Sequence, residues 1–379
     1  MTDTDPVTTS TDPNRTYVEY HDDIETPEPR EAEDIETMVR VLRLNNERAY
    51  RKYKHGIRDA HAKGHGLLRG ELEVAADLPP EFAQGMFAES KTYPIVARYS
   101  STSGAIRNDG VRGVRGLGVK VIGVDGDRLQ DDDATTQDFI MVTHREFLFK
   151  GARDYATKGM VFAFWLARLP DPLLKVGSKL LAALDQEVLA RLPGRCSLPE
   201  SLMVFVKPNT HILGDWFHTS APLRYGRHVA KMQIVPSSPE VKALSGHLIG
   251  DDPGVNALRD SIVDFYALHS AEYALQVQLC TDLATMPIED ATAEWKESES
   301  PYVTVATIRF PSQDPATPER VAFADDVLSF NSWRGLQAHR PLGSINRLKR
   351  RVYDASSDFR HQANNAPRIE PSDVGELPR

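Results

Sequence analysis

Two side chains that lie far apart in the sequence, His61 and Tyr353, have the chemistry of an iron site. His61 follows Arg58 by three residues, and Tyr353 stands in a helix-patterned stretch between Lys349 and Arg360. An imidazole takes up and releases protons near neutral pH. A phenolate ligates ferric iron. Because the two groups must approach from different sides of a pocket, we interpret them as opposite faces of one iron site.

Helical geometry supports the grouping around Tyr353. On a helix with 3.6 residues per turn, Lys349, Tyr353 and Arg360 are offset from one another by only about 20 to 40 degrees. A phenol and two cations are therefore expected to point the same way. Nearby positive charge favours the phenolate form of a tyrosine, whose ordinary pKa is about 10.

The side of His61 gains a second cation and a hydroxyl from Arg98-Tyr99-Ser100, at the end of a predicted strand. Guanidinium groups keep their charge and bind carboxylates with two parallel hydrogen bonds.

Five segments, in this order, resemble the haem catalases: 61–64, 71–74, 96–100, 115–120, and Tyr353 with Arg360. The resemblance spans roughly residues 40–365. More specifically, the chain resembles the short catalase-related proteins, which end soon after the tyrosine helix. It implies an α+β fold. The expected architecture is an antiparallel β-barrel of about eight strands with surrounding helices and a C-terminal helix that carries the haem ligand.

The same resemblance implies roles for single residues. His61 would be the distal acid–base residue, Ser100 its hydrogen-bond partner, and Tyr353 the axial ligand of the iron. The arginines that match haem-contacting positions of the family are Arg58, Arg98 and Arg360. The implied cofactor is haem b, and the implied substrates are hydrogen peroxide or small organic hydroperoxides.

The chain departs from the family pattern on both sides of the expected haem. Lys349 replaces an arginine that donates to the phenolate, so we expect charge support without paired hydrogen bonds, with some compensation from Arg350. The family's distal asparagine aligns best with Thr135 and second with Gln137. Ala60 replaces a bulkier branched residue. These departures predict a wider pocket that favours organic hydroperoxides over fast dismutation.

Three kinds of function stay open. The first is a haem enzyme that decomposes peroxide as a catalase or a peroxidase, and a related option is the rearrangement of fatty-acid hydroperoxides, as in the catalase-like allene oxide synthases. The second is a haem carrier or sensor without catalysis. The third is a haem-free protein such as a metal hydrolase, which would use His61 and His65. The glycine-rich segment 113–118 does not match a dinucleotide fingerprint.

Hydrophobic patterning indicates which elements position these residues. Residues 1–30 are rich in Thr, Asp, Pro and Glu and predict a flexible tail. A single haem domain is expected over 31–365, beginning with an amphipathic helix from Ile35. The expected barrel covers about 66–310, with strands near 70–74, 93–99, 116–122, 138–142, 231–235, 273–279 and 302–308 and helical patterning over 150–195. A helix over about 343–361 would carry Tyr353, and residues 366–379 would form a C-terminal tail.

Composition narrows the functional class further. The 379 residues carry a net charge of -9, and the one basic cluster, 347–351, gives little support for nucleic-acid binding. The two cysteines, Cys196 and Cys280, predict neither a disulfide framework nor a zinc ribbon. No apolar run approaches the roughly 20 residues that cross a bilayer, and no signal peptide is recognised. We therefore expect a cytoplasmic protein without a membrane span, and a homo-oligomer is possible.

Overall fold

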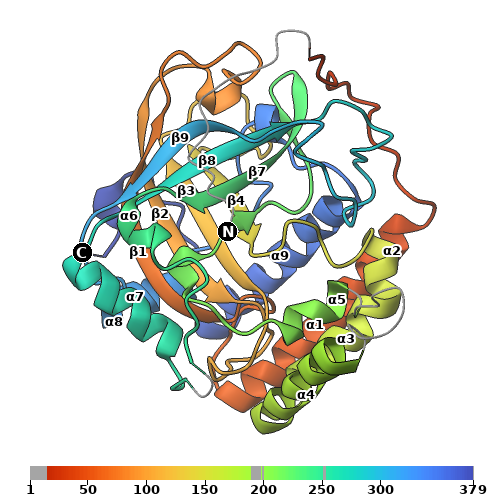
Figure 1. The fold of residues 1–379 in the computed structure, drawn as a ribbon, viewed down its shortest axis with the longest axis vertical. Coiled ribbons are helices and arrows are strands. Elements are labelled where there is room, and N and C mark those ends of the chain that lie inside the picture. Colours follow the sequence, from red (N-terminus) through yellow and green to blue (C-terminus); the bar gives the residue numbers. More distant parts are fainter. Residues whose placement is uncertain (1–14, 189–197, 199, 251–252, 379) are drawn as a thin grey trace.

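The centre of the molecule is an antiparallel β-barrel, shown for the computed structural model in Figure 1. The structure describes residues 15–188, 198, 200–250 and 253–378. Within them the strand order is β5-β4-β3-β2-β1-β9-β8-β7-β6, and an additional pairing of β5 with β7 closes a barrel of eight strands, with β6 outside the ring. The strands are β1 (Lys63–Val74), β2 (Thr92–Ser101), β3 (Arg115–Ile122), β4 (Thr136–Val142), β5 (Phe217–His218), β6 (Leu223–Tyr225), β7 (His228–Pro236), β8 (Ala271–Leu279) and β9 (Val303–Phe310).

Alternation along the strands separates the barrel core from its outer wall. On β2, Ile95, Ala97 and Tyr99 enter the main hydrophobic cluster, while Arg98 and Ser100 between and beyond them belong to no hydrophobic cluster. Successive side chains of a strand point to opposite faces of the sheet. Arg98 and Ser100 therefore share the outer face of β2, where they can contribute to a site.

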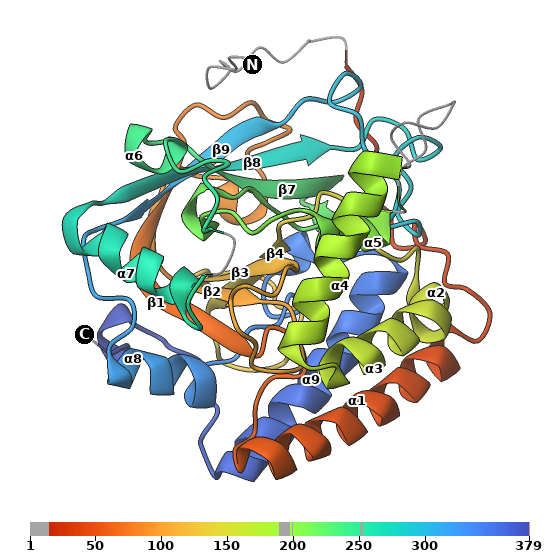
Figure 2. The same ribbon diagram turned by 60° about the horizontal axis from the view of Figure 1, so that its bottom comes forward.

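Helices cover the outside of the barrel. Figure 2 shows α1 (Glu31–Tyr53) and α9 (Ser344–Asn364) side by side beneath the barrel, with α3 (Met160–Arg168) and α4 (Asp171–Ala183) next to them. The remaining α-helices are α2 (Ala152–Asp154), α5 (Glu200–Val206), α6 (Pro239–Lys242), α7 (Ala257–Leu268) and α8 (Pro318–Ala322). π-helical turns cover Tyr155–Gly159, Leu184–Val188 and Phe323–Val327, and 3₁₀ turns cover Gly85–Phe87, Ile212–Gly214, Gln337–His339 and Val374–Glu376.

An ion-pair network holds the start of α9. Arg347 pairs with Glu25, with Glu31 of α1 at 2.6 Å and with Glu289 at 2.8 Å. Glu289 also accepts from the backbone N–H of Ser344, one of the groups at a helix start that the helix itself leaves unpaired. The network fixes the direction in which α9 runs past the barrel. Acids of the same chain therefore neutralise the charge of Arg347, the first residue of the basic cluster.

The expected barrel and the expected C-terminal helix are both present. The strands run longer than the patterning indicated, since β1 begins at Lys63 and β2 extends through Ser101. The helix expected over 343–361 spans Ser344–Asn364. In the part of the chain that the structure describes, none of the helices combines the length and hydrophobicity needed to cross a bilayer.

The expected flexible tail over 1–30 needs correction in its described part. From residue 15 the chain lies against the barrel: the Val18 N–H donates to the Cys280 carbonyl at 2.8 Å, and Glu19 forms a bridge with His228. Ile24 is buried in one cluster with Cys280. The composition is polar, but backbone hydrogen bonds and a few apolar anchors suffice to order it. Residues 1–14 lie outside the described part.

The C-terminal segment also packs on the barrel. Glu370 pairs with the fully buried Lys120 of β3 at 2.7 Å, and Leu377 is buried in a cluster with Val96 of β2. The chain beyond α9 therefore covers the outer wall of β2 and β3 next to the candidate site.

Candidate functional site

A cavity lies between the outer wall of the barrel and α9. Its walls come from β2, β3, β4, the segment before β1, the segment after the π-turn Phe323–Val327, and α9. The residues that line it are Arg58, Asp59, Ala60, His61, Arg98, Ser100, Leu117, Gly118, Ile140, Met141, Ser329, Phe330, Val352, Tyr353, Ser356, Ser357 and Arg360. Six of the predicted site residues, from three separate stretches of sequence, therefore meet in one place.

Strand register builds the wall of this cavity in two rows. Ser100 of β2 pairs with Gly116 of β3, and Gly116 pairs with Val142 of β4. A Cβ at Gly116 would lie 2.2 Å from Cε1 of His61, so only glycine leaves room for the imidazole. In the next row, Gly118 leaves room for the ring of Phe330, which would meet a Cβ at 3.0 Å.

Three contacts fix the imidazole of His61. Its Nδ1 lies 3.0 Å from the Ser100 hydroxyl, and the Thr102 hydroxyl lies 3.3 Å from each ring nitrogen. His61 has a positive φ of 58°, in the left-handed region that non-glycine residues adopt rarely. Its carbonyl accepts from Arg98 at 3.1 Å. The neighbouring residues therefore hold both the backbone and the ring of His61.

The Ser100 hydroxyl indicates which ring nitrogen carries the proton. It donates to the carbonyl of Gly116 at 3.3 Å, which leaves its lone pairs to accept from Nδ1–H of His61. Nε2 is then the nitrogen without a proton. Burial, together with the charges of Arg98, Lys349 and Arg58, lowers the pKa of His61 to about 3. The ring is therefore neutral at physiological pH and can accept a proton at Nε2.

The three predicted arginines converge on the segment from Ala324 to Ser329. Arg58 donates to the carbonyls of Ala324 and Leu328 at 2.6 Å each. Arg360 donates to the Leu328 carbonyl at 3.1 Å and to the Ser329 hydroxyl at 2.9 Å. Burial and the neighbouring cations lower the pKa of Arg58 well below its ordinary value and that of Arg360 to about 10.

Among the described residues, one carboxylate pairs with this cluster. Asp325 lies 2.9 Å from Arg98 and 3.4 Å from Arg58, and Arg360 reaches only its backbone carbonyl. Burial opposes ionisation of Asp325, but the guanidinium groups outweigh it, and the pKa of Asp325 is lowered. Asp326, which pairs with His55, also acts on Arg58 and Arg360 through its charge, but the three cations still outnumber these two carboxylates. Buried charges require partners, so the excess of positive charge favours a negatively charged ligand.

Tyr353 and Lys349 enter the cavities from one face of α9, as the helical spacing predicted. In the described part of the chain no hydrogen bond reaches the Tyr353 hydroxyl, and burial raises the pKa of Tyr353 to about 12. Burial lowers the pKa of Lys349 to about 8. The Lys349 ammonium lies 5.2 Å from the centre of the Phe147 ring. Arg350, expected to compensate for Lys349, packs on Trp333 instead.

Thr135 lies outside the cavity, contrary to our expectation. It precedes β4, and its carbonyl accepts from Val124. The β4 residue beside the Ser100 row is Val142, seven residues further on, or about 23 Å along a strand. Gln137, the second candidate, accepts from the backbone of Leu336. On β4, apolar side chains such as Val142 therefore face the site in place of an amide.

Sequence reasoning missed Asp59 and Thr102. Asp59 lines both cavities, and burial raises its pKa to about 7. Its position between Arg58 and His61 was a signal, because residues of one short segment lie close to the same pocket. Thr102 follows Ser100 by two residues on the same face of the chain. The strand period of two could have identified it.

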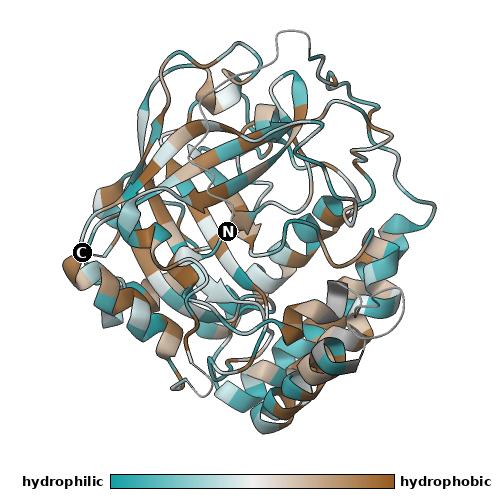
Figure 3. Cartoon of the chain, in the orientation of Figure 1, coloured by the Kyte–Doolittle hydropathy of each residue, from teal (hydrophilic) through white to brown (hydrophobic). Residues whose placement is uncertain are grey.

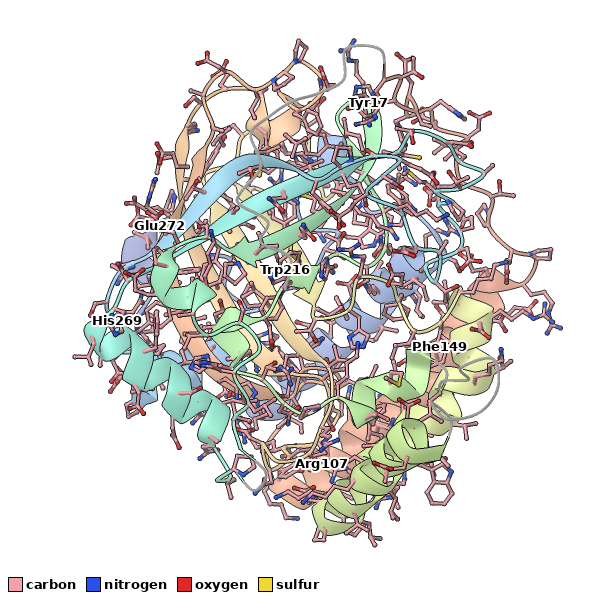
Figure 4. All side chains as sticks on the ribbon, viewed as in Figure 1. Tyr17, Arg107, Phe149, Trp216, His269 and Glu272 are labelled. Atoms are coloured by element: carbon pink, nitrogen blue, oxygen red, sulfur yellow. The ribbon has the colours of Figure 1, made fainter. Side chains whose placement is uncertain are left out.

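A second, mostly apolar cavity of about 210 Å³ continues from the first and shares Asp59, Ala60, His61, Ile140, Val352 and Tyr353 with it. Phe149, which Figure 4 labels beside α5, belongs to its wall. Further lining residues from α1, β4 and α3 are Met38, Leu42, Val142, Ala163, Leu166 and Ala167. His144 also lines it, and burial lowers the pKa of this histidine to about 4. The site therefore has an arginine-rich end and an apolar end.

The histidines proposed for a metal hydrolase do not come together. His65 is a fully buried residue of β1 whose Nε2 lies 2.7 Å from the Ser101 hydroxyl. His61 precedes the strand and bonds to Ser100 instead. The two rings therefore have separate partners.

Comparison with known proteins places the fold. No family model matches the chain, and no curated protein matches its sequence. Two solved structures are similar to it over 93% of its length. A fungal catalase is 14% identical with a TM-score of 0.54, and catalase A from Saccharomyces cerevisiae is 15% identical with a TM-score of 0.56. The chain has the catalase fold. It covers 68% and 70% of these two catalases.

The catalase fold confirms the fold class expected from the short motifs. At 14% and 15% identity, the similarity concerns the fold. The narrower expectation of a short catalase-related protein stays a prediction.

Proposed function

We propose that this protein binds haem in the cavity between β2–β4 and α9 and uses it to decompose peroxides. The observation that carries the proposal is the charge distribution around one cavity. The buried Arg98 and Arg360 and the partly buried Arg58, with a single paired carboxylate, form one side. A neutral His61 faces the cavity from the barrel, and Tyr353 faces it from α9.

The residues present fit a haem. Its propionates would face the excess positive charge of Arg58, Arg98 and Arg360. The Nε atoms of Arg98 and Arg360 are buried without a hydrogen-bond partner, so donors remain for carboxylate oxygens. Tyr353 has no competing hydrogen bond within the described chain and would ligate the iron as a phenolate. Lys349, one turn before it on α9, would supply positive charge nearby.

Bound haem would supply a ferric iron that binds peroxide and cleaves its oxygen–oxygen bond. The chain would supply proton transfer. Nε2 of neutral His61 would accept a proton from the inner peroxide oxygen and return it to the outer oxygen, so that water or an alcohol leaves. Ser100 would hold the ring through Nδ1 and stabilise the imidazolium that forms. Asp59, with a pKa near neutrality, would hold or release a proton at the border of the two cavities.

The apolar cavity supports organic hydroperoxides as substrates beside hydrogen peroxide. Ile140, Val142 and Phe149 offer hydrocarbon surface next to His61, and β4 offers no amide to orient a small peroxide. Burial of an alkyl chain contributes about 0.8 kcal/mol for each methylene group. A substrate with an apolar tail would therefore bind more tightly than hydrogen peroxide itself.

The visible spectrum of the purified protein tests the haem site. After haem-replete expression we expect a Soret band with ferric tyrosinate character, and Tyr353→Phe should lose that character or the haem itself. Tyr302→Phe, at a partly buried tyrosine that lines neither cavity, is the matched control. A colourless wild-type protein would contradict the proposal. Turnover is then compared between hydrogen peroxide, a second molecule of which supplies the two electrons and is released as oxygen, and cumene hydroperoxide, which is assayed with a phenol as the two-electron donor.

A haem carrier without catalysis is the second candidate. The observation that favours it is the pair of departures in the site: Lys349 where an arginine was expected, and Val142 where β4 meets the site. A protein that keeps the haem spectrum but produces neither oxygen from hydrogen peroxide nor alcohol from organic hydroperoxides would support it. Product analysis also distinguishes the rearrangement of a fatty-acid hydroperoxide, which forms an epoxide instead of an alcohol.

A further inference from the structure

Two neighbouring helices expose an unusual amount of hydrocarbon. On α3, Val161, Phe164 and Trp165 are 38% to 59% exposed. On α4, Leu173, Val176 and Leu180 are 56% to 66% exposed. Spacings of three, four and seven residues place each set on one side of its helix. Figure 3 shows hydrophobic residues recurring along both ribbons. Contiguous apolar patches of this kind mark interaction surfaces.

The opposite side of α3 lines the apolar cavity. Successive helical residues are 100 degrees apart. On that wheel the exposed residues Val161, Phe164 and Trp165 centre about 180 degrees from the cavity-lining Gly159, Ala163, Leu166 and Ala167. One helix therefore separates the apolar cavity from the exposed apolar surface.

Positive charge accompanies this surface. Residues 152–188, which run through the π-turn that continues α4, contain five basic side chains and four acidic ones, a net charge of +1 in a chain whose total is -9. Two of the acids are paired: Asp154 with Lys158 at 2.7 Å, and Asp171 with Arg107 at 2.7 Å. Lys179 is exposed on α4 beside Val176 and Leu180. A stripe of Trp, Phe and Leu flanked by Lys and Arg is the composition of helices that lie in the interface of an anionic membrane.

We propose that α3 and α4 dock this protein onto an anionic lipid surface. The basic flanks would contact phosphate headgroups, and the exposed stripes would enter the acyl boundary. Peripheral docking requires no spanning helix. A second copy of the chain fits this face less well, because a twofold interface places the same patch on both sides and would bring net positive charge against net positive charge.

The position of the cavity gives docking a function, and this step rests on the proposed peroxide chemistry. Hydroperoxides with long apolar tails concentrate in membranes. A protein held with α3 at the lipid surface would take such substrates into the cavity behind that helix without carrying the tail through water. The site would then act on peroxidised lipid chains at the membrane.

Vesicle flotation tests the docking. The purified full chain is mixed with vesicles of phosphatidylcholine alone, or of phosphatidylcholine and phosphatidylglycerol in equal parts. We expect flotation with the anionic vesicles and release at about 1 M salt, where charges are screened within about 3 Å. Trp165→Ser combined with Leu173→Ser should weaken binding about tenfold or more, because two apolar side chains that would enter the lipid are lost. Leu268→Ser removes an 80% exposed leucine at the end of α7 and is the matched control.

Charge reversal provides an independent variant. Lys179→Glu should weaken binding to anionic vesicles, whereas Lys91→Glu, at an exposed lysine before β2, should not. If the wild type fails to float, the docking proposal is wrong. A dimer in sedimentation that the double variant dissociates, without flotation of the wild type, would assign the face to a second copy and also overturn it. Flotation does not depend on haem, so failure of docking and failure of the haem site are separate results.

Discussion

At the scale of single residues, the neutral imidazole of His61 is the group on which proposed turnover depends. The residue combines a left-handed backbone, a Ser100 hydrogen bond and a pKa of about 3. Its ordinary pKa is about 6.5, so the folded site favours the form that can accept a proton. A side chain of similar size without a titratable nitrogen would keep the shape of the site and lose this ability.

His61→Gln is therefore expected to retain haem and to lower peroxide turnover by a factor of about 10² to 10⁴. Steady-state rates with hydrogen peroxide and cumene hydroperoxide, normalised to haem content, measure the effect. His269→Gln is the control, because this exposed histidine follows α7 and lines neither cavity (Figure 4). Unchanged rates in His61→Gln would mean that another group moves the proton.

Lys349 is the second residue whose chemistry can be measured. Burial brings its pKa to about 8, so the ammonium loses its charge above that pH. The proposed phenolate of Tyr353 would then lose a nearby cation. An arginine at this position would keep its charge.

We expect the haem spectrum of the wild type to change as the pH rises through about 8, and that of Lys349→Arg to stay constant to about pH 10. Absorbance titration measures both. Lys349→Gln should match the high-pH form of the wild type at every pH. Identical titration curves for the wild type and Lys349→Arg would show that the charge of Lys349 does not affect the haem spectrum.

The residues of the site were predictable to different degrees. His61, Ser100 and Tyr353 lie in distinctive local patterns, and the structure brings them to one cavity. Thr135 was placed by its distance along the chain, but strand register decides which end of β4 meets the site, and register is fixed by pairing with β3. The perturbed pKa of Asp59 arises from burial, which a sequence does not display.

At the scale of elements, glycines on β3 shape the wall that receives the imidazole. Gly116 stands in a strand between Ser100 and Val142, where any side chain on its outer face would meet the His61 ring. The backbone itself does not require glycine here, because the strand conformation suits any residue. The requirement is space.

Gly116→Ala should therefore displace the ring of His61, since the added Cβ would lie 2.2 Å from Cε1. We expect haem binding to persist and turnover to fall about 10²-fold, as misplacement of a catalytic group by about 1 Å produces losses of that order. Gly113→Ala is the matched control, because a Cβ at Gly113 meets no atom within 4 Å. Turnover per haem, with circular dichroism as a folding check, distinguishes the two variants.

Elements with strong periodicity were predictable, and short ones were not. The helix that carries Tyr353 and the long strands follow apolar periods of 3.6 and 2. β5 has two residues and β6 has three, too few for a period, yet β5 closes the barrel. The polar segment 15–30 is held by backbone hydrogen bonds to the barrel, which depend on neighbours more than two hundred residues away.

At the scale of the whole molecule, buried histidines dominate the dependence of stability on pH. Burial lowers their pKa values to about 3 for His61, His218 and His339 and to about 4 for His144 and His361. Below pH 6.5 the unfolded chain binds protons at these positions and the folded chain does not, so stability falls as the pH falls. Asp59 and Asp138 act in the opposite direction, because burial raises their pKa values to about 7 and about 6.

Five histidines outweigh two carboxyl groups, so we expect the melting temperature to fall by about 5 °C or more between pH 7 and pH 5. Asp59→Asn removes one opposing contribution and should make the fall steeper. Thermal melts by circular dichroism at pH 5, 6 and 7 measure both proteins. A melting temperature that rises toward pH 5 would mean that the carboxyl groups dominate.

The burial of Cys280 has a consequence for a protein proposed to work in peroxide. A thiol reacts with peroxide through its thiolate. Burial raises the pKa of Cys280 to about 12, and the segment around Val18 and Ile24 covers it. The folded chain thus keeps this sulfur protonated and covered, and under the proposed function the N-terminal segment would shield the enzyme from inactivation by its own substrate.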